Sequence, residues 1–158
     1  MPLLDLTVDT NVFLHSCNPI ETRFGDAVHF LSLLVASTTT LAIDDGFNVD
    51  PAKNTSLIGG EYLQKFVPGS LAHAVVTTLA LNARIAITPT KLSAGVNKKL
   101  NQMVANRRDR TFVKVCANSQ GKALVTHDFQ DFSNKKRRDL GVIFSIAIME
   151  ACDATALL

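Results

Sequence analysis

Short apolar segments of strand length alternate with amphipathic segments along this chain, and the alternation limits the possible folds more than any other feature. A continuous apolar or β-branched run predicts a strand, whereas apolar residues recurring every three to four positions predict a helix. The expected strands are Leu3–Val8, Thr38–Ile43, Ile85–Ile87, Lys122–Thr126 and Val142–Ser145. The expected helices cover residues 19–36, 57–66, 70–82, 108–119 and 134–140, and residues 88–97 are expected to be loop. This order predicts an α/β fold, a three-layer α/β/α sandwich with a central, mainly parallel sheet.

Length and composition favour one compact unit. Of 158 residues, 47% are hydrophobic and 19% charged, so residues 1–158 are expected to form a single domain with a packed core. The cysteines Cys17, Cys116 and Cys152 lack metal-binding spacing and are expected to be buried thiols in a reducing compartment. No basic segment typical of a signal peptide precedes the first strand, and the most apolar stretch, residues 71–87, is too short to cross a bilayer. We therefore expect a cytoplasmic protein without a membrane partner.

The charges are distributed unevenly along the chain. Residues 97–158 hold 11 Lys and Arg against six Asp and Glu, whereas residues 1–96 hold five against eight. A polyanionic partner that meets the C-terminal part of the chain would explain this asymmetry, and so would a basic face that contacts only solvent.

Carboxylates follow three of the expected strands. Asp9 comes directly after the first strand, the pair Asp44 and Asp45 ends the second, and Asp128 follows the strand at Lys122–Thr126. Function gathers at the carboxyl ends of strands in parallel α/β folds, so these acids are expected at one edge of the sheet.

Two further acids extend this group. Glu61 falls on the helix after the second strand, and Asp109 opens the helix at 108–119. Four carboxylates at one edge would repel each other unless a cation offset their charge. Mg²⁺ and Mn²⁺ suit such all-oxygen sites, and two such ions can assist hydrolysis of a phosphodiester.

Each acid also has an ordinary structural interpretation. Asp109 can complement a helix dipole, and Asp44 and Asp45 can be turn residues beside Gly46. Asp131 can cap the helix that follows it, and an exposed helical glutamate would explain Glu61.

Four segments, in this order, resemble the motifs of the PIN-domain nucleases, a family that includes the ribonucleases of bacterial toxin–antitoxin pairs. They are Val8–Phe13 (VDTNVF), Gly60–Tyr62 (GEY), Arg108–Val113 (RDRTFV) and Leu124–Phe132 (LVTHDFQDF). The resemblance runs from about Leu4 to Ser145. It implies a parallel sheet between helices and a metal-dependent endonuclease, usually acting on RNA, with Mg²⁺ or Mn²⁺ as cofactor.

The resemblance also implies roles for individual residues. It matches Asp9, Glu61, Asp109 and Asp128 to the acidic quartet that binds metal and carries catalysis. It further matches Asp131 to an additional metal-binding acid, Thr126 to a hydroxyl residue beside the site, and Asn11 to an asparagine that hydrogen-bonds the acids. An antitoxin-like inhibitor and a homodimer are further expectations.

The segment 44–56 departs from the family pattern. An acid after the second strand takes part in some variants, so Asp45 is a second candidate there, and the match of Glu61 requires a helix that starts near Ser56. His127 lies beside the site, where we expect a surface or gatekeeping position, with a general-base role as the alternative.

Basic residues near the acids are candidates for contacts with nucleic acid. The candidates are Arg108 and Arg110 together with the run Lys135, Lys136, Arg137 and Arg138. Lys98, Lys99 and Arg107 would extend the patch. Phosphate contacts and a solvated helix face are both compatible with such a run.

Three other interpretations compete with a nuclease. A haloacid-dehalogenase-type phosphatase needs a second aspartate where Asn11 stands, and a response-regulator receiver needs a late lysine that is absent. The third is a PIN-like fold that no longer cuts RNA and serves as a binding or assembly module. The intact set of acids argues against it, because a surface used only for binding gains nothing from clustered negative charge.

Overall fold

The computed structural model describes residues 1–158 and contains one sheet of five strands, all of them paired in parallel. The strands are β1 (Asp5–Val8), β2 (Thr40–Asp44), β3 (Ile85–Thr88), β4 (Ala123–Val125) and β5 (Ala147–Met149). Their order across the sheet is β3-β2-β1-β4-β5. The central strand β1 is buried on both faces, as expected for a strand covered by helices on either side.

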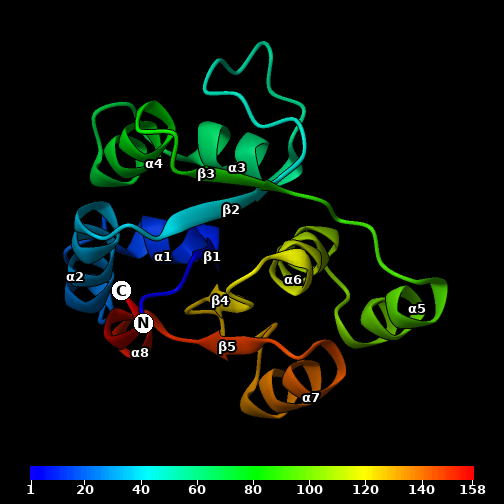
Figure 1. Ribbon diagram of the computed structural model, residues 1–158. Helices are drawn as coiled ribbons and strands as arrows, with labels where there is room; N and C mark the ends of the chain where they lie inside the picture. Colours follow the sequence, from blue (N-terminus) through cyan, green and yellow to red (C-terminus); the bar gives the residue numbers. More distant parts are fainter.

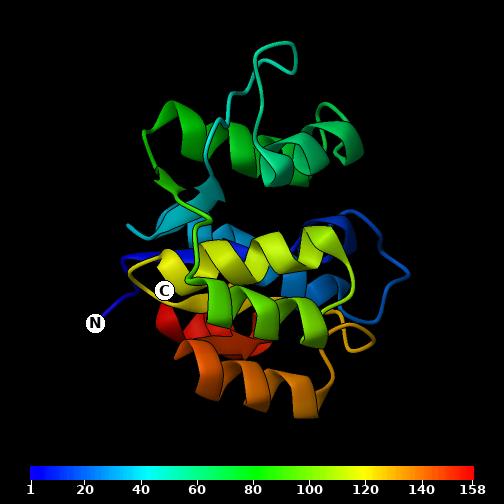
Figure 2. The same cartoon turned by 90° about the vertical axis from the view of Figure 1, so that its right-hand side faces the viewer.

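Eight α-helices and a short 3₁₀ turn connect and follow the strands. They are α1 (Thr10–His15), α2 (Phe24–Ala36), α3 (Leu57–Lys65), α4 (Leu71–Leu81), α5 (Ala94–Met103), α6 (Arg107–Asn118), α7 (Asn134–Phe144), α8 (Ala151–Ala154) and η1 (Thr155–Leu157). Figure 1 shows α2 and α8 on one side of the sheet and α6 and α7 on the other. Figure 2 shows α5 lying beside α6 as an outer helix of the second layer. The predicted three-layer α/β/α arrangement is confirmed.

The core lies between the sheet and its two helical layers. It comprises 33 buried apolar residues in one cluster, which includes the aromatic side chains of Phe13, Tyr62 and Phe112. The amino end of β1 lies close to the C-terminus, where the Leu3 backbone N–H donates to Leu157 O at 3.0 Å. None of the helices combines the length and apolar character needed to cross a membrane.

Polar side chains define the starts of several helices. The residues that accept a backbone N–H at a helix start are Ser56 for α3, Ser70 for α4, Asn106 for α6 and Ser133 for α7. The predicted start of the third helix near Ser56 is thereby confirmed, which fixes the position of Glu61 on the second turn. Ser133, and not Asp131, caps α7.

Three predicted elements were wrong. The predicted helix at 19–36 begins only at Phe24, while a separate six-residue helix, α1, follows Asp9 directly. The predicted loop at 88–97 contains the start of α5. The predicted strand at Val142–Ser145 is the last turn of α7 and its cap, and the final strand follows at Ala147.

The cysteine prediction was correct for one thiol only. Cys116 is buried, whereas Cys17 and Cys152 are exposed. Cys116 lies on the inner face of α6, while the other two follow the short helix α1 and open α8, where little chain covers them.

The strand order places a reversal at β1. The chain moves from β1 to β2 and β3 on one side and then returns to build β4 and β5 on the other side. Connections after β1 and β4 therefore leave the sheet in different directions at their carboxyl ends, and an opening forms between them. Asp9 follows β1 and Asp128 lies in the loop after β4, so both acids lie at this opening.

Candidate metal centre

Five carboxylates line one open cavity at the reversal point of the sheet, which we call the acid cavity. They belong to Asp9, Glu61, Asp109, Asp128 and Asp131. The cavity has a volume of about 210 Å³, and the only apolar side chain in its wall is that of Leu14. The structure thus brings together the five acids that the resemblance matches to the metal site, and it leaves Asp44 and Asp45 outside.

Asp9 is held in place by contacts to the neighbouring strand and loop. Its backbone N–H donates to Val125 O at 2.9 Å. Its side-chain Oδ2 accepts from Thr126 Oγ1 at 2.7 Å and from Asn11 Nδ2 at 2.8 Å. Asn11 also accepts from the His127 backbone N–H at 3.0 Å, so it ties α1 to the loop after β4. Both supporting residues predicted by the resemblance therefore contact Asp9 or its neighbours.

Asp128 lies in a tight loop that its own side chain organises. Its Oδ1 accepts from the backbone N–H groups of Gln130 at 2.8 Å and Asp131 at 2.9 Å. Its backbone N–H donates to Thr126 Oγ1 at 3.0 Å. The same threonine hydroxyl thereby positions both Asp9 and Asp128.

Glu61 and Asp109 reach the acid cavity from two helices, α3 and α6, that pack against the sheet. α3 and α6 pack against each other, and α6 buries Phe112, Val113 and Cys116 against the sheet. This packing aims one side chain of each helix inward, so that both acids are only 8% exposed. Glu61 Oε2 and Asp109 Oδ2 are buried oxygens without any hydrogen-bond partner in the protein.

Three of the acids are close enough to share one cation. One carboxylate oxygen from each of Asp109, Asp128 and Asp131 lies within 4.8 Å of the other two. Asp109 is buried and the other two are partly exposed, so the group is open to solvent on one side. Such a set of oxygens fits a hard divalent cation that keeps some of its waters.

Burial and mutual repulsion perturb two of the acids. Burial raises the pKa of Asp9 from 3.8 to about 6; the negative charges of Asp128 and Glu61 also raise it, and the Thr126 hydrogen bond opposes them. Burial raises the pKa of Asp109 from 3.8 to about 7, with further contributions from the charges of Asp9, Asp131 and Asp128. No cationic side chain is therefore placed to compensate the negative charges of Asp9 and Asp109.

Together, these features fit a site for a cation. A buried carboxylate oxygen without a partner costs free energy that a cation would recover. Asp109 Oδ2 lacks any partner and Glu61 Oε2 has only a long ion pair with Arg108 at 3.9 Å, and both residues line the acid cavity. We conclude that the Asp109, Asp128 and Asp131 group can hold a metal ion, with Asp9 and Glu61 at its side.

Two cationic side chains stand at the wall of the acid cavity. Lys65 Nζ donates to Glu61 Oε1 at 3.0 Å, and Arg108 Nε lies 3.9 Å from Glu61 Oε2. Arg108 was predicted as a contact for nucleic acid, but Lys65 was missed. Its position four residues after Glu61, on the same face of a helix, was the available signal.

The acids after β2 lie outside the cavity. Asp44 is buried and accepts from Ser56 Oγ at 2.5 Å, from the Leu57 backbone N–H at 2.7 Å and from the Ile58 backbone N–H at 3.0 Å. The interpretation of Asp44 as an ordinary turn residue was therefore wrong, because it anchors the start of α3. Asp45 is exposed and does not line the acid cavity.

His127 was wrongly expected at the surface. It is buried, its Nδ1 lies 2.9 Å from Nδ1 of His15, and its Nε2 accepts from the Ala151 backbone N–H at 3.3 Å. Burial, and then the charges of His15 and Arg23, lower the pKa of His127 to about 4. The ring contacts α1 and α8 and does not line the acid cavity.

The basic run on α7 serves several purposes. Arg137 donates from Nε to Phe132 O at 2.7 Å and from Nη2 to Asp128 O at 3.2 Å. Its guanidinium also lies 4.2 Å from the centre of the Phe129 ring. Arg137 thus supports the loop of the acid cavity, a role that sequence reasoning missed.

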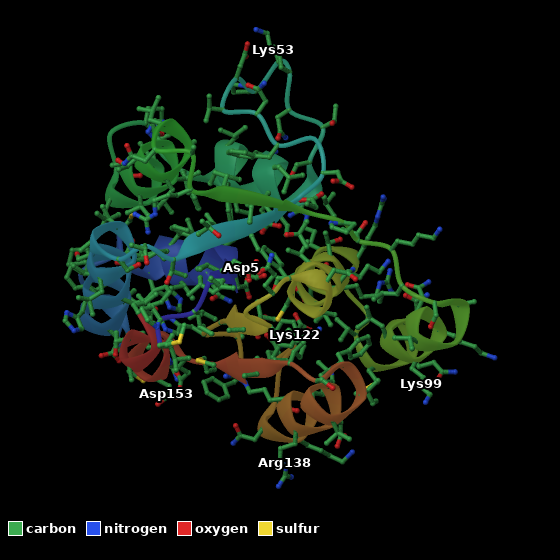
Figure 3. All side chains as sticks on the ribbon, in the orientation of Figure 1. Asp5, Lys53, Lys99, Lys122, Arg138 and Asp153 are labelled. Carbon is green, nitrogen blue, oxygen red and sulfur yellow. The ribbon has the colours of Figure 1, made fainter.

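The other members of the run are more accessible. Lys135 Nζ pairs with Asp139 Oδ2 at 3.0 Å on the helix surface, and Lys136 is partly buried. Arg138 is exposed on the outer side of α7 (Figure 3). Their contacts with nucleic acid stay a prediction.

Comparisons of the chain with family models, with curated proteins and with solved structures gave no match. The acid cavity, its supporting hydrogen bonds and its flanking cations are therefore the basis for a functional assignment.

Proposed function

We propose that this chain is a Mg²⁺- or Mn²⁺-dependent endoribonuclease of the PIN type. The observation that carries the proposal is the meeting of five carboxylates in one cavity, two of them with a buried oxygen that has no hydrogen-bond partner in the protein. The order of the acid-bearing motifs supports the same assignment. RNA is the proposed substrate, while an antitoxin-like inhibitor and a homodimer stay expectations from the resemblance.

The residues of the acid cavity divide into groups with different tasks. Asp109, Asp128 and Asp131 would hold the cation, with Asp9 and Glu61 completing the set. When bound, the cation supplies an activated water and offsets negative charge on the phosphate oxygens. Thr126 and Asn11 keep Asp9 in a fixed orientation through their hydrogen bonds to its Oδ2.

Lys65 and Arg108 would meet the substrate. Both line the acid cavity beside Glu61, so their charges face the place where a scissile phosphate would approach. Arg108 is half exposed and holds Glu61 only at 3.9 Å, so its guanidinium is free to turn toward a phosphate oxygen. Positive charge there favours binding of the phosphodiester and its orientation for in-line attack.

The test is cleavage of generic single-stranded RNA by the purified protein. Wild type should cut with Mg²⁺ or Mn²⁺ and stop when a chelator is added. Asp9→Asn and Asp128→Asn should abolish cleavage and keep the circular dichroism spectrum of wild type. Asp45→Asn removes an acid close to the same edge but outside the cavity, so it should leave cleavage unchanged.

Two results would count against the proposal. Equal cleavage by wild type and both cavity variants would assign the activity to a contaminant. RNA binding without cleavage under any divalent ion would favour the module that binds RNA and does not cut it.

A further inference from the structure

A second cavity is lined mainly by α5 and α6, the two helices that Figure 2 shows side by side. We call it the α5–α6 cavity; it has a volume of about 470 Å³, larger than the acid cavity. α6 contributes Arg107, Arg110 and Lys114 to its wall, and α5 contributes Asn97 and Asn101. The acids of the proposed catalytic centre do not line it. Its lining is almost wholly polar, and Leu57 is its only apolar residue.

The cations of the α5–α6 cavity have no carboxylate partners. None of Arg107, Arg110 and Lys114 forms a salt bridge, although Arg110 Nη1 donates to the carbonyls of Val104 and Ala105 at 3.3 and 3.2 Å. Three positive charges therefore stand together on one face of α6 without internal compensation. Such a cluster attracts anions, and guanidinium groups suit phosphate oxygens in particular.

The single acid in the wall forms no salt bridge with these cations. Asp44 lines the cavity, but both of its carboxylate oxygens accept hydrogen bonds from the start of α3. Its oxygens are thus turned to Ser56, Leu57 and Ile58 and not to the cations.

A third cavity, of about 250 Å³, shares lining residues with both of the others. Its wall consists of Ser56, Leu57, Gly60, Glu61, Gln64 and Arg108. It shares Glu61 and Arg108 with the acid cavity and Leu57 with the α5–α6 cavity. The three cavities therefore follow one another across the first turns of α3 and α6, from the acid cavity to the α5–α6 cavity.

We infer that the α5–α6 cavity binds the phosphate–ribose backbone of the substrate strand, at nucleotides to one side of the bond that is cut. This inference rests on the proposed function, which places a phosphodiester in the acid cavity. An RNA strand that leaves the acid cavity past Arg108 would enter this third cavity. It would then meet Arg107, Arg110 and Lys114. The volume lies within the roughly 300–1,000 Å³ of small-ligand sites, which fits part of one strand and not a duplex. The carboxamides of Asn97 and Asn101 are polar groups that can meet the ribose or base.

The experiment compares two double variants of equal charge change in the presence of chelator. Arg107→Gln with Lys114→Gln removes two cations of the cavity, and neither side chain has a hydrogen bond within the protein to lose. Lys98 and Lys99, which the sequence offered together with Arg107 as an extension of the basic patch, are exposed on α5 and line none of the cavities, so Lys98→Gln with Lys99→Gln is the control (Figure 3 labels Lys99). Binding of a fluorescein-labelled single-stranded oligoribonucleotide is followed by anisotropy over a range of salt concentrations.

We expect the cavity variant to lose affinity roughly tenfold or more at about 0.1 M salt. The slope of log K against log salt should fall by about 1.4, since each lost phosphate contact on a single strand contributes about 0.7. The α5 variant should keep a slope near that of wild type. Equal losses in the two variants would reduce the cavity to part of a general basic field and overturn the inference. No loss in either would overturn it as well.

Competition separates a strand from free phosphate as the ligand. Inorganic phosphate should not displace the oligoribonucleotide at an equal concentration of phosphate groups, because the strand makes several contacts at once. Displacement at equal concentration would assign the cavity to free phosphate and overturn the inference. Binding is measured without metal and without cleavage, so failure of the proposed nuclease activity would leave this result readable by itself.

Discussion

Asp109 is a buried carboxylate whose Oδ2 has no partner within the protein. Its pKa of about 7 means that the protonated form is favoured in the folded protein over a wide range of pH, whereas an unfolded chain ionises it near 3.8. Asp9 behaves in the same way with a pKa of about 6. Both residues therefore tie the stability of the metal-free fold to pH.

The sign of this dependence is fixed by the direction of the shifts. Between about pH 4 and pH 7, Asp9 and Asp109 bind more protons in the folded than in the unfolded state, so their contribution to the stability of the metal-free protein should fall as pH rises. Buried His127, whose pKa is lowered to about 4, contributes with the opposite sign, so the effect of the acids is read from the difference between wild type and a variant that lacks one of them. Asp109→Asn should flatten the profile and raise the free energy of unfolding at pH 8 by roughly 2–4 kcal/mol. Urea unfolding in chelator at several pH values measures both effects.

Asp45→Asn is the control for this experiment, because Asp45 is an exposed acid outside the cavity. It should leave the pH profile of wild type unchanged. An Asp109→Asn variant whose pH profile equals that of wild type would contradict the raised pKa of Asp109.

The sequence predicted the positions of some residues of the site and its surroundings but not of others. Asp9 and Asp128 follow strands of the central sheet, and the end of a strand fixes where the next side chain points. Lys65 was missed because the rotation of α3 about its own axis decides which residues face the cavity, and packing against α6 sets that rotation. His127 was misplaced for a similar reason, since the position of α8 decides what covers it.

Helix α3 brings Glu61 to the cavity, and its start is fixed by Ser56. The Ser56 hydroxyl accepts from the Gly59 backbone N–H at 2.8 Å and donates to Asp44 Oδ1. Ser70 caps α4 in the same manner through the His73 backbone N–H at 3.3 Å, but α4 carries no residue of the acid cavity.

These two caps give a matched pair of variants. Ser70→Ala should lower the free energy of unfolding by about 1 kcal/mol, the usual effect of losing a cap. Ser56→Ala should lower it further, because it also removes the donor to the buried Asp44 carboxylate. Only Ser56→Ala should also weaken Mn²⁺ binding, because it alone loosens the turn before Glu61. Chemical unfolding and metal titration of both variants measure this, and an equal loss of metal affinity in the two would refute it.

The loop after β4 depends in turn on α7. Arg137→Gln removes the donors to Phe132 O and Asp128 O and the contact with the Phe129 ring, so it should destabilise the fold by about 1–3 kcal/mol. Mn²⁺ affinity should fall as well, because the loop that carries Asp128 and Asp131 loses its support. Arg138→Gln changes the same charge at the adjacent exposed position and should do neither. Similar melting temperatures for the two variants would rule out the supporting role.

At the level of elements, long amphipathic helices and buried strands could be predicted, and short or weakly patterned elements could not. The helix α1 has only six residues, too few to show a helical period. In α5 only Leu100 is buried, so its apolar pattern is faint. Val142 and Ile143 suggested a strand by their β-branched side chains, yet both lie on the exposed side at the end of α7, where packing of Leu140 and Phe144 decides the structure.

Over the whole molecule, the acid cavity should couple metal binding to folding. At a free ion concentration about a hundredfold above the dissociation constant, the fold should gain about 2.7 kcal/mol. This corresponds to a rise in melting temperature of roughly 5–10 °C for a chain of this size. Thermal melts with chelator and with Mn²⁺ measure the shift.

Asp9→Asn provides the internal comparison. It removes one repulsive charge, and the amide oxygen can still accept from Thr126 and Asn11, so the metal-free variant should melt above wild type. It should gain less from Mn²⁺, because a candidate ligand is lost. A wild-type protein that shows no metal-dependent shift would contradict the assignment of a working cation site.

The residues of the acid cavity come from distant parts of the sequence, and this separation determines when the cavity can form during translation. Asp9 and Thr126 share a hydrogen bond although they are 117 residues apart in the sequence. Strand β1 can pair with β4 only after β4 has been synthesised. A ribosome delivers the N-terminal part first, so β1, β2 and β3 can begin to assemble long before the loop with Asp128 emerges. A nascent or truncated chain that ends before this loop carries Asp9, Glu61 and Asp109 but lacks two of the three acids that can share a cation. The acid cavity can therefore be completed only in one late step, after the loop with Asp128 and Asp131 has been synthesised.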